Sequence, residues 1–157
     1  MTLALSSLDT HNSELAQQIH AIRMLAYQQE AQLLGISHFP PLQQTMADIL
    51  GSRELFTGAF EGDVLAAVIS LCPDDEGRGM CLSSLVVHPA YQRRGLGRAL
   101  VKSAIDRAGD TVFYVQTAVA NVPALALYVS LGFREQRRWR VGPELLELLE
   151  LRRPALT

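Results

Sequence analysis

The chain has 157 residues, of which 48% are hydrophobic and 19% are charged, so we expect one globular domain with a sizeable buried core. Its 14 basic and 16 acidic residues give a formal net charge of −2, which argues against binding to nucleic acid or to a membrane through overall charge. No segment approaches the roughly 20 apolar residues of a membrane span, and the N-terminus has no basic leader region, so we expect a cytoplasmic protein. The two cysteines, Cys72 and Cys81, lack metal-ligand spacing and are expected to be reduced.

The first third of the chain predicts a strand followed by two helices. Residues 2–8 have the composition of a strand, and Asp9 or Asn12 can cap a helix that ends at Gly35. A proline-containing break then leads to a second helix over residues 42–50.

The remaining two thirds predict a hairpin and then alternating strands and helices. A turn at residues 62–63 joins two strand-like runs. The later predicted elements are strand 80–87, helix 98–108, strand 111–117, a helix that starts at Pro123, and strand 133–141. Residues 144–153 have an apolar spacing that suits a helix nearly as well as a strand. This order indicates a mixed α/β (α+β) fold, with one central sheet flanked by helices.

The segment "VVHPAYQRRGLGRAL", residues 86–100, predicts an anion-binding turn. The first N–H groups of the helix that follows lack intrahelical partners and lie at the positive end of its dipole, so they suit phosphate oxygens. Gly95 and Gly97 would let a ligand approach the backbone, and Arg93, Arg94 and Arg98 add charged donors.

Three other interpretations of this segment are weaker. A purely structural helix start would favour acidic residues, and none occurs here. A dinucleotide-binding turn would need a third glycine and a shorter distance from the strand, and a P-loop would need a G-K-[ST] sequence.

Two motifs resemble the GCN5-related N-acetyltransferases (GNAT), a family of acetyl coenzyme A-dependent enzymes. Residues 92–97, "QRRGLG", match the family signature Q/R-x-x-G-x-G/A. Residues 121–133, "NVPALALYVSLGF", are similar to the later family segment N-x-x-A-x-x-L-Y-x-x-x-G-F. The resemblance covers residues 54–134 well, while residues 1–53 fit in layout only.

The resemblance implies a GNAT-like acyl-CoA N-acyltransferase fold in a single domain, residues 1–157. Residues 1–53 would supply the first strand and the substrate-side helices, 54–134 the acetyl-CoA-binding core, and 135–157 the C-terminal strands. Acetyl-CoA would be the co-substrate and no metal would be needed. Its pantetheine arm would run between strands 82–87 and 111–117, with its pyrophosphate on the amides of the glycine-containing turn.

The same resemblance implies roles for individual residues. The Leu85 N–H would face the thioester carbonyl as an oxyanion donor, and Tyr128 would protonate the departing thiolate. Packing against Leu125 is the plainer interpretation of Tyr128, and Asn121 could be a cofactor contact, a helix N-cap or both. The implied cofactor-binding set is Leu85, Val86, Val87, Gln92, Arg93, Arg94, Gly95, Leu96, Gly97, Arg98, Asn121 and Tyr128.

The general base is not evident in the sequence. Several relatives carry an acidic residue on the strand before the glycine motif, whereas residues 81–85 contain none. Tyr27, Glu30 and His38 fall in the region that covers the substrate side in this family, where surface or packing roles are the simpler expectation. His88 and Cys81 are left out of the catalytic set, because direct transfer needs no acyl-enzyme.

The acceptor is expected to be a small-molecule amine or a peptide N-terminus. The two motifs look most like those of ribosomal-protein alanine N-terminal acetyltransferases, but residues 134–146 depart from the tyrosine-rich segment of those enzymes. The arginines of that segment could be a solvated strand face or attract an acidic substrate. The alternative function is a non-catalytic coenzyme A-binding or sensor module. Residues 144–151 could bury their apolar side chains in the sheet or form a homodimer contact.

Overall fold

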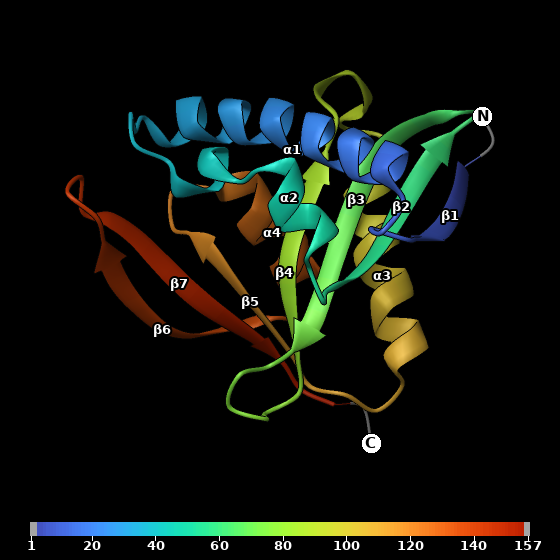
Figure 1. Cartoon of the computed structure of the whole chain (residues 1–157). Helices are drawn as coiled ribbons and strands as arrows, with labels where there is room; N and C mark the ends of the chain where they lie inside the picture. The colour runs from blue at the N-terminus through green and yellow to red at the C-terminus, as the bar shows by residue number, and fades with distance from the viewer. Residues whose placement is uncertain (1–2, 156–157) are drawn as a thin grey trace.

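The computed structural model describes residues 3–155 and contains a seven-stranded sheet with helices on both faces (Figure 1). The strands are β1 (Leu3–Leu8), β2 (Leu55–Glu61), β3 (Val64–Pro73), β4 (Met80–Val87), β5 (Phe113–Ala118), β6 (Arg134–Val141) and β7 (Leu146–Arg153). The helices are α1 (Ser13–Leu34), α2 (Met46–Leu50), α3 (Leu96–Ala108) and α4 (Val122–Ser130), with 3₁₀ turns η1 (Pro40–Gln43) and η2 (Pro89–Tyr91). The predicted mixed α/β fold is confirmed.

The sheet has the order β1-β2-β3-β4-β5-β7-β6, and its neighbours are antiparallel except for β4 and β5. The predicted hairpin forms between β2 and β3, where Glu61 is paired with Val64. The ambiguous C-terminal segment is a strand, because β7 fills the place between β5 and β6 and buries Leu149 and Leu151. Its apolar residues therefore serve this protein's own sheet.

Helix α1 begins at the cap that its sequence provides. The Asn12 side chain accepts hydrogen bonds from the backbone N–H groups of Glu14 (3.0 Å) and Leu15 (3.2 Å). Of the two candidate caps, Asn12 is therefore the one used. Gly35 ends the helix in the left-handed conformation at φ 66°, which glycine adopts without strain.

The predicted second helix, 42–50, is wrong in its extent. The chain forms η1, two extended residues (Gln44 and Thr45), and then the short helix α2. Thr45 is the cause, because its hydroxyl accepts from the Asp48 N–H at 3.2 Å while the Asp48 carboxylate accepts from the Thr45 N–H at 2.8 Å. This capping box requires an extended backbone at Thr45 (φ −104°, ψ 165°), so the helix starts after it.

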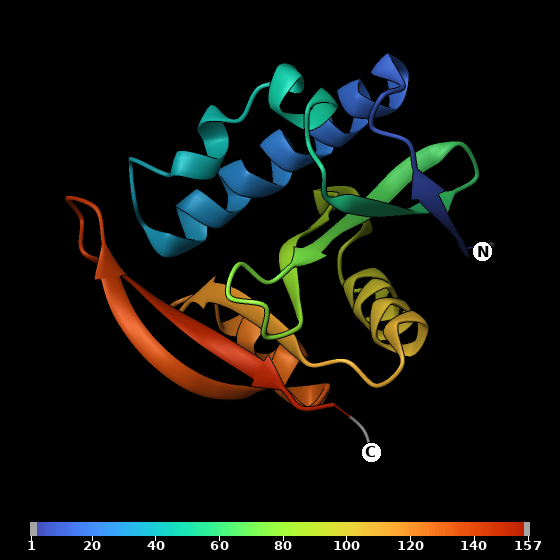
Figure 2. The same ribbon diagram turned by 60° about the horizontal axis from the view of Figure 1, so that its bottom comes forward.

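The helices divide between the two faces of the sheet, and each pair covers its own core (Figure 2). Helices α1 and α2 cover one face, where Ile19 and Ile49 are fully buried. Helices α3 and α4 cover the other face, where Leu100 and Phe133 are buried. Because the sheet separates these two sets of helices, a ligand or side chain that contacts both sets must pass through an opening in the sheet.

Among residues 3–155, no helix is both long enough and apolar enough to cross a membrane.

Candidate active site

Strands β4 and β5 form an opening in the middle of the sheet. They pair only at Met80 with Phe113, Cys81 with Tyr114, and Leu82 with Val115. Beyond these pairs the strands diverge, as Figure 1 shows, while β5 continues along β7. Residues 83–87 of β4 therefore have a neighbour on the β3 side and none on the β5 side.

The backbone of Leu85 points into this opening. The His88 N–H donates to the Ala66 carbonyl of β3 at 2.8 Å. Because hydrogen-bonding direction alternates along an antiparallel ladder, Val86 also faces β3, whereas Leu85 and Val87 face the opening. The Val87 carbonyl, accordingly, accepts from the Gln92 side chain at 3.4 Å. The Val86 backbone faces β3 and its side chain is buried on the α1 face, so we expect Leu85 and Val87 to make the backbone contacts of this strand.

The glycine-containing turn places backbone N–H groups beside the opening. Arg93 and Gly95 have positive φ angles of 65° and 77°, and α3 starts directly after Gly95. The first helical hydrogen bond of α3 runs from the Ala99 N–H to the Gly95 carbonyl, so the N–H groups of residues 96–98 have no acceptor within the helix. These N–H groups are free to bind an anion, so the turn stays the candidate cradle that the sequence predicts.

Gly97 lies where the cradle meets the opening. A Cβ built on it would lie 3.5 Å from Leu85 Cδ2, 3.6 Å from Val87 Cγ2 and 3.7 Å from Leu127 Cδ2. These are ordinary van der Waals distances, so the protein alone has room for a methyl group at this position. That methyl would contact the side chains of Leu85 and Val87 of β4.

Two of the three cradle arginines already have partners in the protein. Arg94 Nη1 pairs with Glu61 Oε2 at 3.1 Å, and Arg98 Nη1 donates to Ser130 Oγ at 2.7 Å. These contacts brace the turn against β2 and α4. The arrangement suits arginines that support a backbone cradle, as the sequence predicts.

Tyr128 and Asn121 both belong to α4, on the cradle side of the sheet. Tyr128 is 5% exposed, and its ring packs edge-on against Phe133 with 5.5 Å between centroids. Burial, and then the nearby charge of Glu30, raise the pKa of the Tyr128 hydroxyl, so it stays protonated at neutral pH. Asn121 caps the helix by accepting from the Ala124 N–H at 3.3 Å.

The sequence model of the Acetyltransferase (GNAT) family matches residues 16–133, which is most of the chain. The chain belongs to the GNAT acetyltransferase family. The match extends to the N-terminal helices, for which the sequence motifs indicated similarity in layout only.

Named relatives support this assignment. The Bacillus subtilis UPF0157 protein YqkA is 34% identical over 140 residues, which are 88% of this chain and 40% of that protein. The Escherichia coli (strain K12) [ribosomal protein bS18]-alanine N-acetyltransferase is 38% identical over 101 residues, which are 62% of this chain and 66% of that enzyme. The matches therefore cover less than two thirds of either relative.

Solved structures share the GNAT fold over nearly the whole chain. The ribosomal-protein-S18-alanine N-acetyltransferase from Escherichia coli superposes with a TM-score of 0.78 at 24% identity, covering 99% of this chain and 96% of that one. A Bacillus subtilis acetyltransferase in complex with CoA superposes with a TM-score of 0.72 at 20% identity, covering 99% and 100%. The predicted acyl-CoA N-acyltransferase fold is confirmed.

The opposite face of this GNAT sheet carries contacts for which the sequence suggested only packing. Tyr27 on α1 hydrogen-bonds to Ser84 of β4 through their oxygens at 3.0 Å. Gln29 Nε2 donates to Gln92 Oε1 at 3.2 Å, and Glu30 Oε1 accepts from Asn121 Nδ2 at 3.3 Å. The end of α1 therefore contacts β4, the cradle and α4.

A sequence signal for these residues exists in the helical period of α1. Arg23, Tyr27 and Glu30 continue the buried stripe that begins at Ile19, at spacings of four, four and three residues. Arg23 is 1% exposed and donates to Gln44 Oε1 at 2.8 Å and to Ser70 Oγ at 3.2 Å. Polar residues on the core face of α1 are therefore the sequence signal for these contacts. The apolar residues that predict the helix do not reveal them.

Other candidates from the sequence lie away from the opening or are unsuited to catalysis. His38 is exposed, and His88 uses its Nδ1 to accept from the Ala90 N–H at 3.0 Å. Burial raises the pKa of the Cys81 thiol to about 12, so it is a poor nucleophile.

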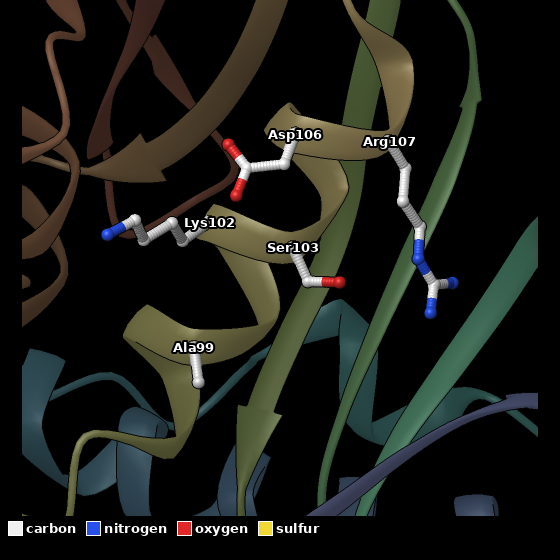
Figure 3. A pocket seen from close by; sticks show the side chains of 5 residues that line it. All are labelled: Ala99, Lys102, Ser103, Asp106 and Arg107. Carbon is white, nitrogen blue, oxygen red and sulfur yellow. The ribbon is translucent and has the colours of Figure 1, made fainter.

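A hollow lies along helix α3, as Figure 3 shows, and is separate from the opening. It is lined by Ala99, Lys102, Ser103, Asp106 and Arg107.

Proposed function

We propose that this GNAT protein transfers the acetyl group of acetyl-CoA directly to a primary amine, with a peptide N-terminus favoured over a small-molecule amine. The observation that carries the proposal is the Leu85 N–H, which faces the opening between β4 and β5 beside the anion cradle. A cradle without a donor at the reaction centre would suit a binding module equally well. The non-catalytic coenzyme A-binding or sensor module is therefore the second choice.

The residues present fit acetyl-CoA as co-substrate. The N–H groups at the start of α3 suit a pyrophosphate, and the lack of a side chain on Gly97 lets a ligand approach the backbone of this turn. The Val87 backbone offers hydrogen bonds to an extended chain of amide groups. Bound there, acetyl-CoA supplies an activated thioester at the level of Leu85.

The protein's own groups then have separate tasks. The Leu85 N–H donates to the thioester oxygen and stabilises the negative charge that develops as the amine attacks. Tyr128, held protonated by its burial, gives its proton to the departing sulfur. Holding donor and acceptor in the opening between the two faces supplies the positioning part of the rate enhancement.

A peptide acceptor is favoured by the names of the relatives. The Escherichia coli relative is an alanine N-acetyltransferase of ribosomal protein bS18, and a Mycobacterium tuberculosis relative is the N-alpha-acetyltransferase RimI, 48% identical over 60 residues. A ribosomal-protein acceptor would place the reaction in the cytoplasm. The exposed edge of β6, rather than the buried residues of β7, is the surface through which a homodimer could form.

Release of free coenzyme A, measured across a panel of peptides with different N-termini and of small amines, tests the proposal. We expect turnover with at least one peptide that begins with a small residue. Binding of coenzyme A without turnover on any acceptor would favour the sensor module. Turnover confined to small amines would keep the chemistry and overturn the peptide assignment.

A further inference from the structure

A carboxylate of α1 is hydrogen-bonded to the residue that caps α4 on the other face of the sheet. Glu30 belongs to α1 on one face, and Asn121 belongs to α4 on the other. Their hydrogen bond, Asn121 Nδ2 to Glu30 Oε1 at 3.3 Å, therefore joins helices that the sheet otherwise separates. Strands β4 and β5, which lie between these two helices in the sheet, pair only from Met80 with Phe113 to Leu82 with Val115 and then part.

The neighbours of Glu30 place it beside the reaction centre. Tyr27, one helical turn earlier on α1, bonds to Ser84, which directly precedes Leu85. Gln29 bonds to Gln92 at the start of the cradle. The cradle lies at the start of α3, on the α3 and α4 side of the sheet, so we expect the acceptor amine to approach from the α1 side, where Glu30 lies.

We propose that Glu30 is a catalytic residue that accepts a proton from the ammonium group of the acceptor across the opening between β4 and β5. This inference rests on the proposed N-acetyltransferase function and adds the base that the sequence of β4 lacks. Glu30 and Tyr128 would then work as a pair, one group accepting and one donating a proton.

The protons balance in this scheme. The acceptor nitrogen begins as an ammonium group with three protons, and one passes to the Glu30 carboxylate and then to water. The nitrogen forms its bond to the carbonyl carbon, the carbon–sulfur bond breaks, and the sulfur takes the Tyr128 proton. A second proton from nitrogen restores Tyr128, and the third stays on the product amide.

The surroundings of Glu30 make its carboxylate a stronger base than an ordinary glutamate. Desolvation raises the pKa of its carboxyl, and the hydrogen bond from Asn121 opposes this in part. The titratable group that faces Glu30 from α4 is Tyr128, while Asn121 is uncharged and Tyr27 is the nearest titratable group on its own buried stripe. No arginine, lysine or histidine contributes to its pKa, so the carboxyl is tuned by burial.

The test compares Glu30→Gln with Glu14→Gln, the same change at an exposed position on the same helix. Glutamine keeps the size of the side chain and can still accept from Asn121. We expect Glu30→Gln to lower kcat by roughly 10²- to 10⁴-fold while the Kd for coenzyme A stays within a factor of two or so. The acidic limb of the kcat–pH profile should disappear in Glu30→Gln and persist in Glu14→Gln.

Thermal stability provides a readout that a structural role would move in the other direction. A carboxyl whose pKa is raised by folding destabilises the protein above that pKa, so removal of the charge should raise Tm at neutral pH. A purely structural Glu30 would lower Tm when replaced. Lower kcat together with higher Tm is therefore the expected signature.

The outcomes separate this inference from the proposed function. If the wild-type protein turns over acceptors and Glu30→Gln keeps both kcat and the acidic limb, Glu30 is not the base and the acetyltransferase function stands. If the wild-type protein binds coenzyme A without turnover, both proposals fall. If Glu30→Gln does not fold, the kcat–pH profile of the wild-type protein tests the role of Glu30 instead. If kcat of the wild-type protein does not fall in acid at a pH above the ordinary glutamate pKa, Glu30 is not the base.

Discussion

The carboxylate of Glu144, at the turn between β6 and β7, accepts a hydrogen bond from the backbone N–H of His38 at 2.9 Å. The Ser37 N–H donates to the same carboxylate at 3.1 Å. This contact, the Glu144 latch, joins the loop after α1 to a turn more than 100 residues later in the chain. The contact ties the loop that follows α1, the helix that carries Glu30, to the turn between β6 and β7.

Removal of the Glu144 latch should loosen both loops without affecting the core. In Glu144→Ala we expect the amides of Ser37 and His38 to exchange hydrogen roughly tenfold faster, because each loses its acceptor. Exchange measured residue by residue at neutral pH checks this, with Glu147→Ala, at a partly exposed glutamate of β7, as the control. Unchanged exchange at both amides would contradict the latch.

The latch should also open in acid. Hydrogen bonds from His38 and then Ser37 lower the pKa of Glu144, so folding favours its charged form. Its contribution is present above the pKa of an unfolded glutamate and is lost as the pH falls through the lower folded value. Protection of the two amides, corrected for intrinsic exchange, should therefore decrease only below the ordinary glutamate range.

Tyr128→Phe should separate chemistry from binding. We expect kcat to fall by roughly 10²- to 10⁴-fold with little change in the Kd for coenzyme A, because only the proton donor is removed. Steady-state kinetics and calorimetry check both quantities. Tyr114→Phe, at a buried tyrosine on β5, is the matched control and should keep full activity.

The pH profile of the wild-type enzyme gives a second check on Tyr128. Burial raises its pKa above the ordinary tyrosine value, so the acid remains protonated throughout the neutral and mildly alkaline range. We expect no loss of kcat from this group below about pH 10. A basic limb near neutrality that vanishes in Tyr128→Phe would contradict the assignment of its pKa.

The two glycines of the cradle should fail in different ways. Gly97→Ala should fold with an unchanged Tm, since its methyl meets ordinary contact distances, but should weaken coenzyme A binding by roughly tenfold. Gly95→Ala should lower the free energy of unfolding by about 1–2 kcal/mol, because φ is 77° there.

Replacing a cradle arginine is the comparison: Arg93→Gln should weaken coenzyme A binding by about fivefold or less. Calorimetry and thermal unfolding give all three results, and equal effects of Gly97→Ala and Arg93→Gln on binding would contradict the backbone cradle.

Cys81 should be almost inert to alkylation in the folded protein. Its pKa of about 12 leaves roughly one thiolate in ten thousand molecules at pH 8. Mass spectrometry after iodoacetamide treatment should find Cys81 unmodified in native protein and modified in denaturant. Rapid native labelling would show that the thiol is more accessible than its place in β4 indicates.

Local signals predicted most of the fold correctly because they act over a few residues. Asn12, Gly35 and Gly109 end or begin helices through their own side chains or backbone angles, and the turn at residues 62–63 joins β2 to β3 as expected. The predicted extent of the second helix, residues 42–50, was wrong for a local reason as well. The Thr45 capping box starts the helix after Thr45 in spite of the helical pattern around it.

The candidate site was predictable in part. The glycine turn, Leu85 and Tyr128 follow from motifs, and their placement around one opening agrees with the roles that the motifs imply. The sequence places Glu30 on the substrate side but does not reveal its contact with Asn121, because that contact depends on how α1 lies across the sheet. The motif could not show that the Val86 backbone faces β3, because a motif gives no direction for alternating backbone groups.

The position of β7 between β5 and β6 has a consequence for synthesis of the protein. Strand β5 pairs with β4 at only three positions and with β7 along its whole length, from Phe113–Arg153 to Ala118–Leu148. One wall of the opening is therefore held by residues that a ribosome makes after every residue of the cradle, α4 and β6. A nascent chain that already carries both sequence motifs should be unable to hold its substrates until residues 146–153 have emerged and entered the sheet.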